Sequence, residues 1–306
     1  MKYFIITIDT EGDNLWTYKE GCKIKTQNAT FLRRFQELCN RYGFIPVWLT
    51  NYEMVMCDEF VEFVKDYISD GRCEVGIHIH AWNNPPHYNL ARKYSGNPYL
   101  IEYPTDIMEQ KFVTTLHLIK ERIGIEPKSH RSGRWAMDDR YFKLLEKYGI
   151  LADCSYTPCT AWTNSPGATI PGGTDYSHVL PYVHRVGNVI EVPMTIRKLP
   201  IVRNLKSVKQ LIKRVINGNT VWLRPSTNSL QEMLHLVDVV DKDHNCNYLE
   251  FMMHSSEFMP GGSPYFKDTE SIEQMYKNIE HLFRYIKQLG YNGISLYDYA
   301  KGTQKQ

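Results

Sequence analysis

Two histidines separated by a single residue are the clearest chemical feature of this sequence. His78 and His80 stand at the end of the apolar stretch 73–77. In an extended chain residues i and i+2 face the same way, so both imidazoles can reach one point. This spacing suits a metal chelate, and Zn²⁺ is the commonest ion where His and carboxylate ligands leave a position open. The alternative is a pair of histidines on a solvated strand end.

The composition is that of an ordinary globular protein. The chain has 306 residues, of which 42% are hydrophobic and 23% are charged. These values allow a sizeable core and indicate neither disorder nor a membrane span. The formal net charge is +2 and no block of basic residues occurs, so nucleic acid is not an expected partner.

The first residues and the cysteines predict a cytoplasmic protein. Residues 1–8 are apolar but meet Asp9 and Glu11 too soon for a signal peptide, so we expect a first core strand there. The seven cysteines include no Cys-x-x-Cys pair. This pattern favours reduced thiols over a disulfide framework.

Apolar runs typical of buried strands alternate with helical patterns along the chain. The candidate strands are 3–8, 45–49, 73–79, 127–130, 150–154, 189–192, 219–223, 248–253 and 292–296. Helical periodicity and capping residues predict helices at 27–42, from Asp58 to near Gly71, from Thr105 or Asp106 to Gly124, and at 138–148, 205–217, 227–242 and 269–289.

Strand–helix alternation of this kind predicts an α/β fold with a parallel sheet. With about seven or eight repeats, the sheet is expected to close into a β/α barrel with outer helices. No Pro/Gly/Ser linker divides the chain, so one domain over 1–306 is predicted. Two segments exceed ordinary loop length, 81–103 and 156–188, and such loops are usually binding loops or lids. Segment 258–265 is either a third lid or an ordinary turn.

Polar side chains follow most of the predicted strands. Barrel enzymes place their chemistry at the C-terminal ends of the strands. A purely structural rim would carry turn-forming residues there, whereas this chain carries acids, histidines and arginines, which predicts a catalytic metal site. The residues are Asp9, Glu11, His78, His80, Arg131, Asp153, Ser155, Arg224, His254 and Asp298.

Five short motifs in this order resemble those of the polysaccharide deacetylase family. They are Thr-Ile-Asp-Thr-Glu-Gly at 7–12, His-Ile-His-Ala-Trp-Asn at 78–83, His-Arg-Ser-Gly-Arg-Trp at 130–135, Asp-Cys-Ser at 153–155 and Met-His-Ser-Ser-Glu at 253–257. The family comprises metal-dependent carbohydrate esterases with a chitooligosaccharide-deacetylase-type domain. The resemblance covers roughly 3–300. It implies a distorted β/α barrel, a divalent metal ion with Zn²⁺ favoured, and an N-acetylated sugar or glycan precursor as substrate.

The resemblance also implies roles for particular residues. Asp9 corresponds to the general base and Glu11 to a metal ligand, although Thr10 separates them here. By the same resemblance Arg131 orients the base and His254 is the general acid.

The second nitrogen ligand departs from the family pattern. The family usually spaces its two histidines four apart, whereas position 82 is Trp in this chain. His80 is therefore expected to provide the second nitrogen beside His78, with Asn83 and His87 as the alternatives.

Hydrolysis of an acetamide needs a nucleophilic water, stabilisation of the oxyanion and a proton for the leaving amine. Asp9 can accept the proton of the water, and His254 can deliver a proton to nitrogen. Asp153 or Glu257 is expected to tune His254. A backbone N–H near Tyr156 is expected to complete the oxyanion site.

Aromatic residues in rim segments are candidates for sugar binding. Trp82, Trp135 and Trp162 are flat surfaces for the C–H faces of sugar rings, or else they pack the loops onto the barrel. Arg134 and Tyr156 are further candidates for substrate contacts. Arginines at this rim could instead pair with surface carboxylates.

Three other functions compete with deacetylation. The same metal site could hydrolyse another C–N bond, such as that of a cyclic amide. A metal-free glycosidase could use Asp9 and Asp153 as paired carboxylates. A glycan-binding barrel without catalysis is disfavoured, because binding needs no base and acid.

Overall fold

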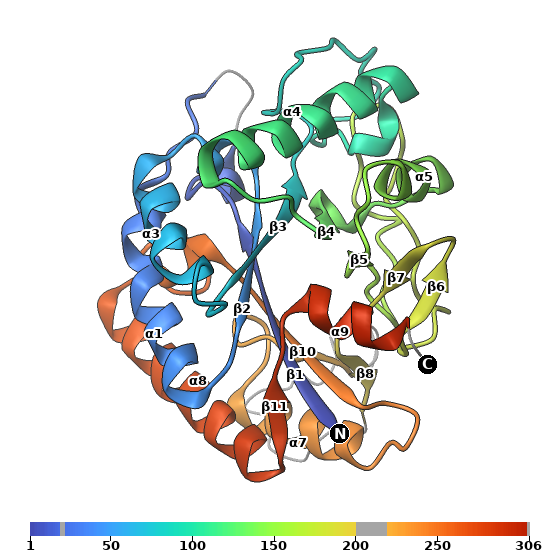
Figure 1. Ribbon diagram of the computed structural model, residues 1–306. Helices are drawn as coiled ribbons and strands as arrows, with labels where there is room; N and C mark the ends of the chain where they lie inside the picture. Colours follow the sequence, from blue (N-terminus) through green and yellow to red (C-terminus); the bar gives the residue numbers. More distant parts are fainter. Residues whose placement is uncertain (19–21, 200–218, 305–306) are drawn as a thin grey trace, which may run out of the picture.

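The computed structural model describes residues 1–18, 22–199 and 219–304 (Figure 1). A curled sheet forms the centre, and helices cover its outside. The strands are β1 (Lys2–Thr10), β2 (Pro46–Thr50), β3 (Glu74–Ile79), β4 (Ser129–Ser132), β5 (Ala152–Asp153), β6 (His184–Val186), β7 (Val189–Glu191), β8 (Ile196–Lys198), β9 (Thr220–Trp222), β10 (Tyr248–His254) and β11 (Tyr291–Gly293).

The sheet is almost entirely parallel. Its order is β10-β1-β2-β3-β4-β5-β7-β6, and β11 also pairs with the start of β1. Only β6 runs antiparallel within it. The antiparallel ribbon β8–β9 lies against β10, where the Met252 N–H donates to the Leu223 carbonyl and the Glu250 N–H to Thr195 Oγ1. The predicted β/α barrel is confirmed in a distorted form, because this ribbon completes one side in place of a continuous ladder.

The helices also follow the sequence pattern. They are α1 (Leu32–Tyr42), α2 (Tyr52–Val55), α3 (Asp58–Ile68), α4 (Thr105–Ile123), α5 (Asp139–Lys147), α7 (Leu230–Asp241), α8 (Thr269–Gln288) and α9 (Leu296–Thr303), with short 3-10 helices η1 (Leu15–Thr17), η2 (Gln27–Phe31), η3 (Leu100–Glu102), η4 (Gly133–Trp135) and η5 (Ser255–Phe258).

Nearly every predicted element is present. Each of the nine candidate runs overlaps a strand, and α1 ends at Gly43, which adopts the left-handed conformation (φ 67°) that glycine tolerates best. The sequence did not indicate β6, β8, α2 or α9, which are short. The helix predicted at 205–217 lies outside the described residues.

Alternate residues of each strand face opposite sides of the sheet. In β1, Phe4, Ile6 and Ile8 pack in the large core between sheet and helices, whereas Ile5 belongs to a separate cluster inside the barrel. Fully burying one such side chain contributes about 1.5–3 kcal/mol. Asp9 therefore shares the inner face with Ile5, because strand side chains alternate with a period of two.

Helix α9 fills the end of the barrel where the strands begin. Leu296 and Tyr299 pack inside against Ile5 and Tyr248, and the Tyr299 hydroxyl donates to Asn247 Oδ1 at 2.7 Å. Figure 1 shows α9 lying across the sheet on this side. Asp298 lies in the first turn of α9, so its predicted place at the catalytic rim is wrong. Strand β11 ends at Gly293 and the chain enters α9 at Leu296, before it reaches the catalytic end of the barrel.

Long loops cover the opposite end, as predicted for 81–103 and for most of 156–188. Within the described ranges, none of the helices combines the length and apolar character needed to cross a lipid bilayer.

Candidate metal centre and active site

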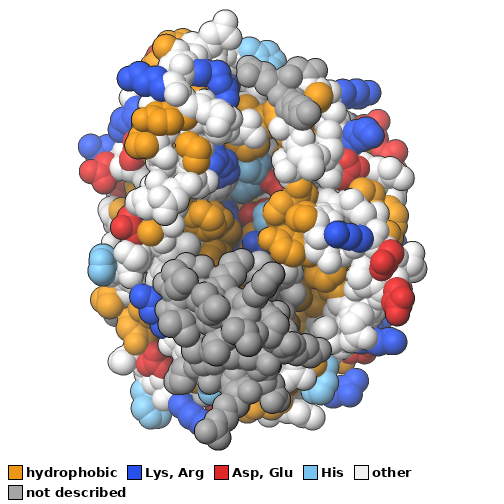
Figure 2. All heavy atoms as spheres, turned by 180° about the vertical axis from the view of Figure 1, so that it is seen from behind, with side chains coloured by type: hydrophobic (Ala, Val, Ile, Leu, Met, Phe, Trp, Pro, Cys, Tyr) orange, Lys and Arg blue, Asp and Glu red, His pale blue; other side chains and the backbone are white. Residues whose placement is uncertain are grey.

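The candidate catalytic residues meet at the C-terminal ends of the strands. Strand register alone pairs Asp9 with His254 across β1 and β10, and His78 with Arg131 across β3 and β4. A cavity of about 380 Å³ opens here. Figure 2 shows the hollow near the middle of this face, with histidine and acidic side chains in its depth and hydrophobic side chains on its rim.

Glu11, His78 and His80 form a buried three-residue cluster. Their candidate ligand atoms all lie within 4.8 Å of one another. His78 Nε2 lies 3.2 Å from His80 Nε2 and 3.5 Å from Glu11 Oε2, and His80 Nε2 lies 2.5 Å from the same carboxylate oxygen. Ligands about 2.0–2.2 Å from a tetrahedral ion lie about 3.3 Å apart, so the two distances from His78 fit such an ion.

A hydrogen bond to the neighbouring strand orients the His78 imidazole toward the cluster. The Arg131 carbonyl lies 2.9 Å from His78 Nδ1 and can only accept, so Nδ1 carries the proton and the Nε2 lone pair faces the cluster. Two imidazoles and a carboxylate form a donor set typical of catalytic Zn²⁺. The residues present therefore fit the divalent ion that the sequence predicts.

Two glycines near the histidines leave no space for a side chain. A Cβ at Gly76 would lie 2.4 Å from Ser129 Oγ, and one at Gly133 would lie 2.2 Å from the Ile79 carbonyl and 3.0 Å from His80 Nδ1. Close packing therefore requires glycine at both positions, and at Gly133 one of the close neighbours is His80 itself.

The acids of the site are ionised despite their burial. Burial alone would raise the pKa of Glu11, but the neighbouring His80 and His78 imidazoles lower it well below its usual value. Burial likewise opposes ionisation of Asp9, yet Arg131 and the histidines hold its pKa below the ordinary range. Both carboxylates can therefore act as a base or a ligand at neutral pH.

Arg131 fixes the position of Asp9. Its fully buried guanidinium donates to Asp9 Oδ1 at 2.7 Å, to Thr7 Oγ1 at 2.7 Å and to Glu250 Oε1 at 2.5 Å. Its Nε donates to the Cys154 carbonyl at 3.1 Å. Because the guanidinium is planar and is held through all three of its nitrogens, the second Asp9 oxygen, Oδ2, is held toward the cavity.

His254 stands between a cation and an anion. Arg224 Nη2 lies 3.0 Å from His254 Nδ1, and Glu257 Oε2 lies 3.5 Å from the same nitrogen. An arginine cannot accept, so in the observed arrangement Nδ1 accepts and the proton lies on Nε2. His254 Nε2 is 3.8 Å from Asp9 Oδ2, so its proton faces the cavity.

Glu257 should therefore contribute strongly to stability. Burial alone would raise its pKa, but Arg224 and His254 lower it from 4.5 to about 2. A depressed pKa stabilises the folded state above the unfolded pKa, and this contribution is lost as pH falls through the folded pKa. Replacing Glu257 with Gln should lower the free energy of unfolding near pH 6 by about 3 kcal/mol, the equivalent of the shift.

Denaturant titrations at several pH values test this expectation. The difference between wild type and Glu257→Gln should narrow as pH falls from about 5 toward 2. The exposed Glu270 offers a control, because Glu270→Gln should change stability by no more than about 0.5 kcal/mol. A difference for Glu257→Gln that stays constant with pH would contradict the assignment.

Neither alternative nitrogen or oxygen ligand joins the cluster. The Asn83 amide donates to Glu53 Oε2 at 2.8 Å, and His87 lines a neighbouring cavity. His80 is the residue that the structure brings to Glu11 and His78.

Three predicted substrate-binding residues line the main cavity. They are Trp82, Arg134 and Trp135, and Trp162 lies there as well. Arg134 and Trp135 are left-handed, with φ values of 57° and 64°. Such angles are costly for non-glycine residues and occur often at functional sites. The Arg134 guanidinium donates to Ser165 Oγ and the Pro166 carbonyl, so it braces a loop instead of pairing with a surface carboxylate.

Asp153 and Tyr156 lie outside this cavity, contrary to expectation. The Asp153 carboxylate lies 2.6 Å from His130 Nδ1 and accepts from Ser155 Oγ at 2.8 Å, on the side of the sheet that faces the helices. Its neighbour Cys154 takes the inner face, so the period of two turns Asp153 outward. Of the two acids expected to tune His254, Glu257 is the one that lies beside it.

The backbone N–H of Tyr156 is already engaged. It donates to Glu191 Oε1 at 2.9 Å, and its ring packs against Tyr176 and His184. The structure therefore does not bring the N–H or the ring of Tyr156 to the place that the sequence analysis expected.

Sequence reasoning missed several residues that shape the site. Glu250 follows the inward alternation of β10 toward His254, and this signal could have revealed it. Glu53 accepts from the Gly12 N–H at 2.7 Å and burial raises its pKa to about 7. Trp16 packs edge-on against the His254 ring at 4.8 Å, and the sequence carries no pattern that predicts this contact.

No family model matches the chain, and no similar curated protein was found. Solved structures do share its fold. A candidate polysaccharide deacetylase from Mycobacterium smegmatis is 12% identical, with a TM-score of 0.52, over 100% of this chain and 91% of that one.

Two more distant structures belong to carbohydrate esterase family 4. An esterase from Streptomyces lividans, solved with acetate, is 10% identical over 95% of this chain and 91% of its own, with a TM-score of 0.46. A pseudoenzyme from Bacillus anthracis is 12% identical over 98% of this chain and 65% of its own, with a TM-score of 0.45. The resemblance noted in the sequence is confirmed at the level of the fold: this chain has the distorted α/β barrel of the Mycobacterium smegmatis candidate polysaccharide deacetylase.

Proposed function

We propose that this protein is a metal-dependent hydrolase that removes an acetyl group from an N-acetylated sugar or glycan precursor. One observation carries the proposal. The Glu11–His78–His80 cluster opens into a cavity that also presents a carboxylate, Asp9, and an imidazole, His254. A binding protein needs a cavity but has no use for this combination.

Glu11, His78 and His80 would hold the metal ion. A divalent ion held there supplies Lewis acidity, which acidifies a water and polarises an acyl carbonyl. Zn²⁺ is the ion that this donor set favours. Asp9 Oδ2 accepts the proton of the attacking water, while Arg131 keeps the carboxylate ionised and immobile.

His254 provides the proton for the departing nitrogen. In the observed arrangement Arg224 donates to His254 Nδ1. When Nδ1 is protonated it can instead bond to Glu257 Oε2, 3.5 Å away, while Arg224 retains its bond to Glu257 Oε1 at 3.2 Å. The imidazolium then has an anionic partner and can release the Nε2 proton into the cavity.

The walls of the cavity suit a sugar. Trp135 and Trp162 stack at 6.5 Å between ring centroids, and Trp82 leans over His80 at 4.3 Å. Aromatic faces of this kind bind the C–H faces of pyranose rings. A cytoplasmic location remains our prediction and would suit a soluble or membrane-linked precursor as substrate.

The rival functions differ in their dependence on metal. The glycosidase alternative needs Asp9 and Asp153 in one cavity, and only Asp9 lies there. Hydrolysis of a cyclic amide would use the same metal cluster.

Acetate release from N-acetylated chitooligosaccharides by the zinc-loaded protein tests the proposal. We expect this activity to be lost on chelation and restored by zinc. Ring opening of a cyclic amide without acetate release would support the alternative.

Removing one ligand should remove the ion without unfolding the protein. We expect His78→Ala to lose bound metal and activity together, since the His78 ring lines the cavity and belongs to none of the hydrophobic core clusters of the described residues. Elemental analysis and circular dichroism measure metal content and fold. His87 provides the matched control, because it lies outside the cluster and His87→Ala should retain the ion. A folded His78→Ala protein with a full complement of metal would refute the ligand assignment.

A further inference from the structure

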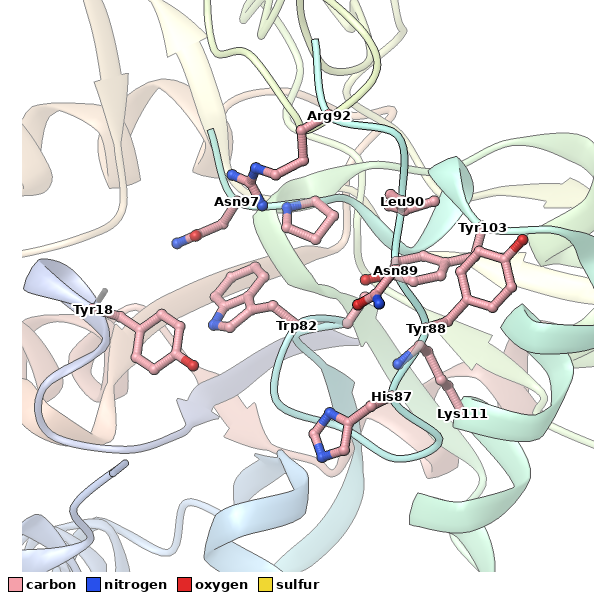
Figure 3. Close-up of a pocket in the computed structure, with 12 residues that line it drawn as sticks. Tyr18, Trp82, His87, Tyr88, Asn89, Leu90, Arg92, Asn97, Tyr103 and Lys111 are labelled. Atoms are coloured by element: carbon pink, nitrogen blue, oxygen red, sulfur yellow. The ribbon is translucent and has the colours of Figure 1, made fainter. Parts of the chain in front are cut away.

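A second cavity adjoins the metal site. It measures about 210 Å³ and is lined mostly by the loop after β3, together with Lys111 of α4. Trp82 and Asn97 line both cavities, so the two are neighbours with a shared wall. In Figure 3 Trp82 lies at the centre of the group, and Lys111 reaches in from its helix below Asn89 and Tyr88.

The described residues that line the second cavity include basic side chains. Among the described residues that line it, none is Asp or Glu, whereas Lys111, Arg92 and His87 are basic. The remaining polar groups are amides and phenols, namely Tyr18, Tyr88, Asn89, Asn97 and Tyr103. Cationic and neutral hydrogen-bond donors of this kind, among the described residues, are suited to an anion.

Lys111 is the buried cation of this cavity. Its side chain is only 1% exposed, and no carboxylate in the described part of the chain pairs with it. Nζ donates to the carbonyls of Asn84 and Pro86, both at 2.6 Å, and lies 4.8 Å from the Tyr103 ring centroid. An ammonium has three donors, so one is left for a ligand.

Burial of the Lys111 ammonium costs free energy of desolvation. The two hydrogen bonds to the loop carbonyls do not require a charged donor. Desolvation lowers the pKa of Lys111 to about 8, so the ammonium is mostly charged at neutral pH. An uncharged donor such as an amide could hold the Asn84 and Pro86 carbonyls without that penalty. A positive charge kept there gains its stabilisation when an anion binds.

We propose that this second cavity binds an anionic group, a carboxylate or a phosphate, carried by the part of the substrate adjacent to the N-acetylated sugar. The inference rests on the proposed function for its connection to the metal site. It assigns the substrate to the acidic glycans or sugar phosphates. The volume suits one sugar-sized unit, and the shared wall at Trp82 keeps that unit next to the reacting one.

Binding of small probes tests the cavity without any turnover. Methyl glucuronide and methyl glucoside differ only in a carboxylate against a hydroxymethyl group, and methyl glucoside 6-phosphate adds the phosphate. None contains an acetamide. Ligand-observed NMR titrations of the metal-loaded protein should show that one or both anions bind about tenfold or more tightly than the neutral glycoside, as for a hydrogen bond to a charged group.

Variants of residues that line the second cavity test whether the anionic probes bind there. Lys111→Met should abolish the preference for the anion, and Lys111→Arg should retain part of it. Asn89 is exposed, so Asn89→Asp should fold normally, place a negative charge in the cavity and weaken the anions selectively. Lys120 is an exposed residue of the same helix that pairs with Glu126, and Lys120→Met should bind like wild type.

The outcomes separate the cavity from the catalytic function. Equal binding of charged and neutral probes, or a preference unchanged in both Lys111→Met and Asn89→Asp, overturns the anion site even if acetate release is found. If Lys111→Met makes the loop after β3 collapse, the binding of all three probes should weaken equally. The anion preference of Asn89→Asp then decides whether the cavity binds anions. Anion-selective binding without acetate release from any substrate would support the cavity and overturn the proposed function.

Discussion

Replacing Asp9 with Asn should leave the metal ion in place and lower turnover by about 10²–10⁴-fold, the usual contribution of a general base. Asn has almost the same shape and can still accept from Arg131 through its carbonyl oxygen. It cannot accept the proton of the attacking water. The measurement is kcat on an N-acetylated chitooligosaccharide, with metal content determined on the same preparation.

The neighbouring carboxylate provides the contrast. Glu11→Gln should weaken retention of metal, because a neutral amide oxygen is a poorer ligand for a dication than a carboxylate. Glu11 lies 2.5 Å from His80, whereas Asp9 bonds to Arg131 at 2.7 Å. The two variants should therefore fail in different ways. Near wild-type turnover by Asp9→Asn would mean that another group is the base.

The parts of the site that the sequence predicted are those governed by local periodicity. His78 and His80 converge because they lie two apart on the inner face of an extended segment, while Ile77 and Ile79 enter the core on the other face. The same rule places Asp9 inside. These predictions need only the period of a strand and no knowledge of the partner strands.

Asp153 shows how the same rule could have corrected an error. Ala152 and Cys154 are the apolar residues of the inner cluster, so a period of two assigns Asp153 to the side of the helices. Its position near the end of the apolar run 150–154 predicts a place at the rim. A strand of two residues, β5, gives too few positions for the alternation to be evident.

Other features depend on contacts between distant segments. The Tyr156 N–H is engaged by Glu191 of β7, and the Trp16 ring packs on His254 from the short 3-10 helix η1. Neither contact leaves a pattern in one sequence, because loops have no period and their partners are set by tertiary packing. The resemblance of ordered motifs supplied what periodicity could not, namely that Asp9 and His254 belong to one site, and strand register pairs them.

Three of the positive groups near the site have separate tasks. Arg131 is fully enclosed and holds Asp9, Arg224 faces His254, and Lys111 stands in the second cavity. A single cationic patch would attract any anion, including the acetate product. Because Arg131 is paired with enclosed carboxylates and Lys111 lies in a separate cavity, a metal ion held by Glu11, His78 and His80 would be the principal electrophile for an acyl oxygen.

Replacing His254 with Ala should impair amide hydrolysis far more than ester hydrolysis. An amine must be protonated as it leaves, whereas an activated phenolate leaves without a proton. Loss of the general acid should therefore lower kcat/KM on an N-acetylated sugar by about 10²–10⁴-fold. On 4-nitrophenyl acetate, which needs only the attacking water and Asp9, the loss should stay within about tenfold.

Two controls make this comparison decisive. His254 lies 4.0 Å from Glu11 Oε1, so metal content must be shown to be unchanged before the rates are compared. His244 is exposed and distant from the cavity lining, and His244→Ala should keep both activities. Equal losses on amide and ester in a metal-loaded, folded His254→Ala protein would show that His254 stabilises the oxyanion or the fold, and that the leaving amine takes its proton from another group, for which Asp9 would be the nearest candidate at 3.8 Å from the imidazole.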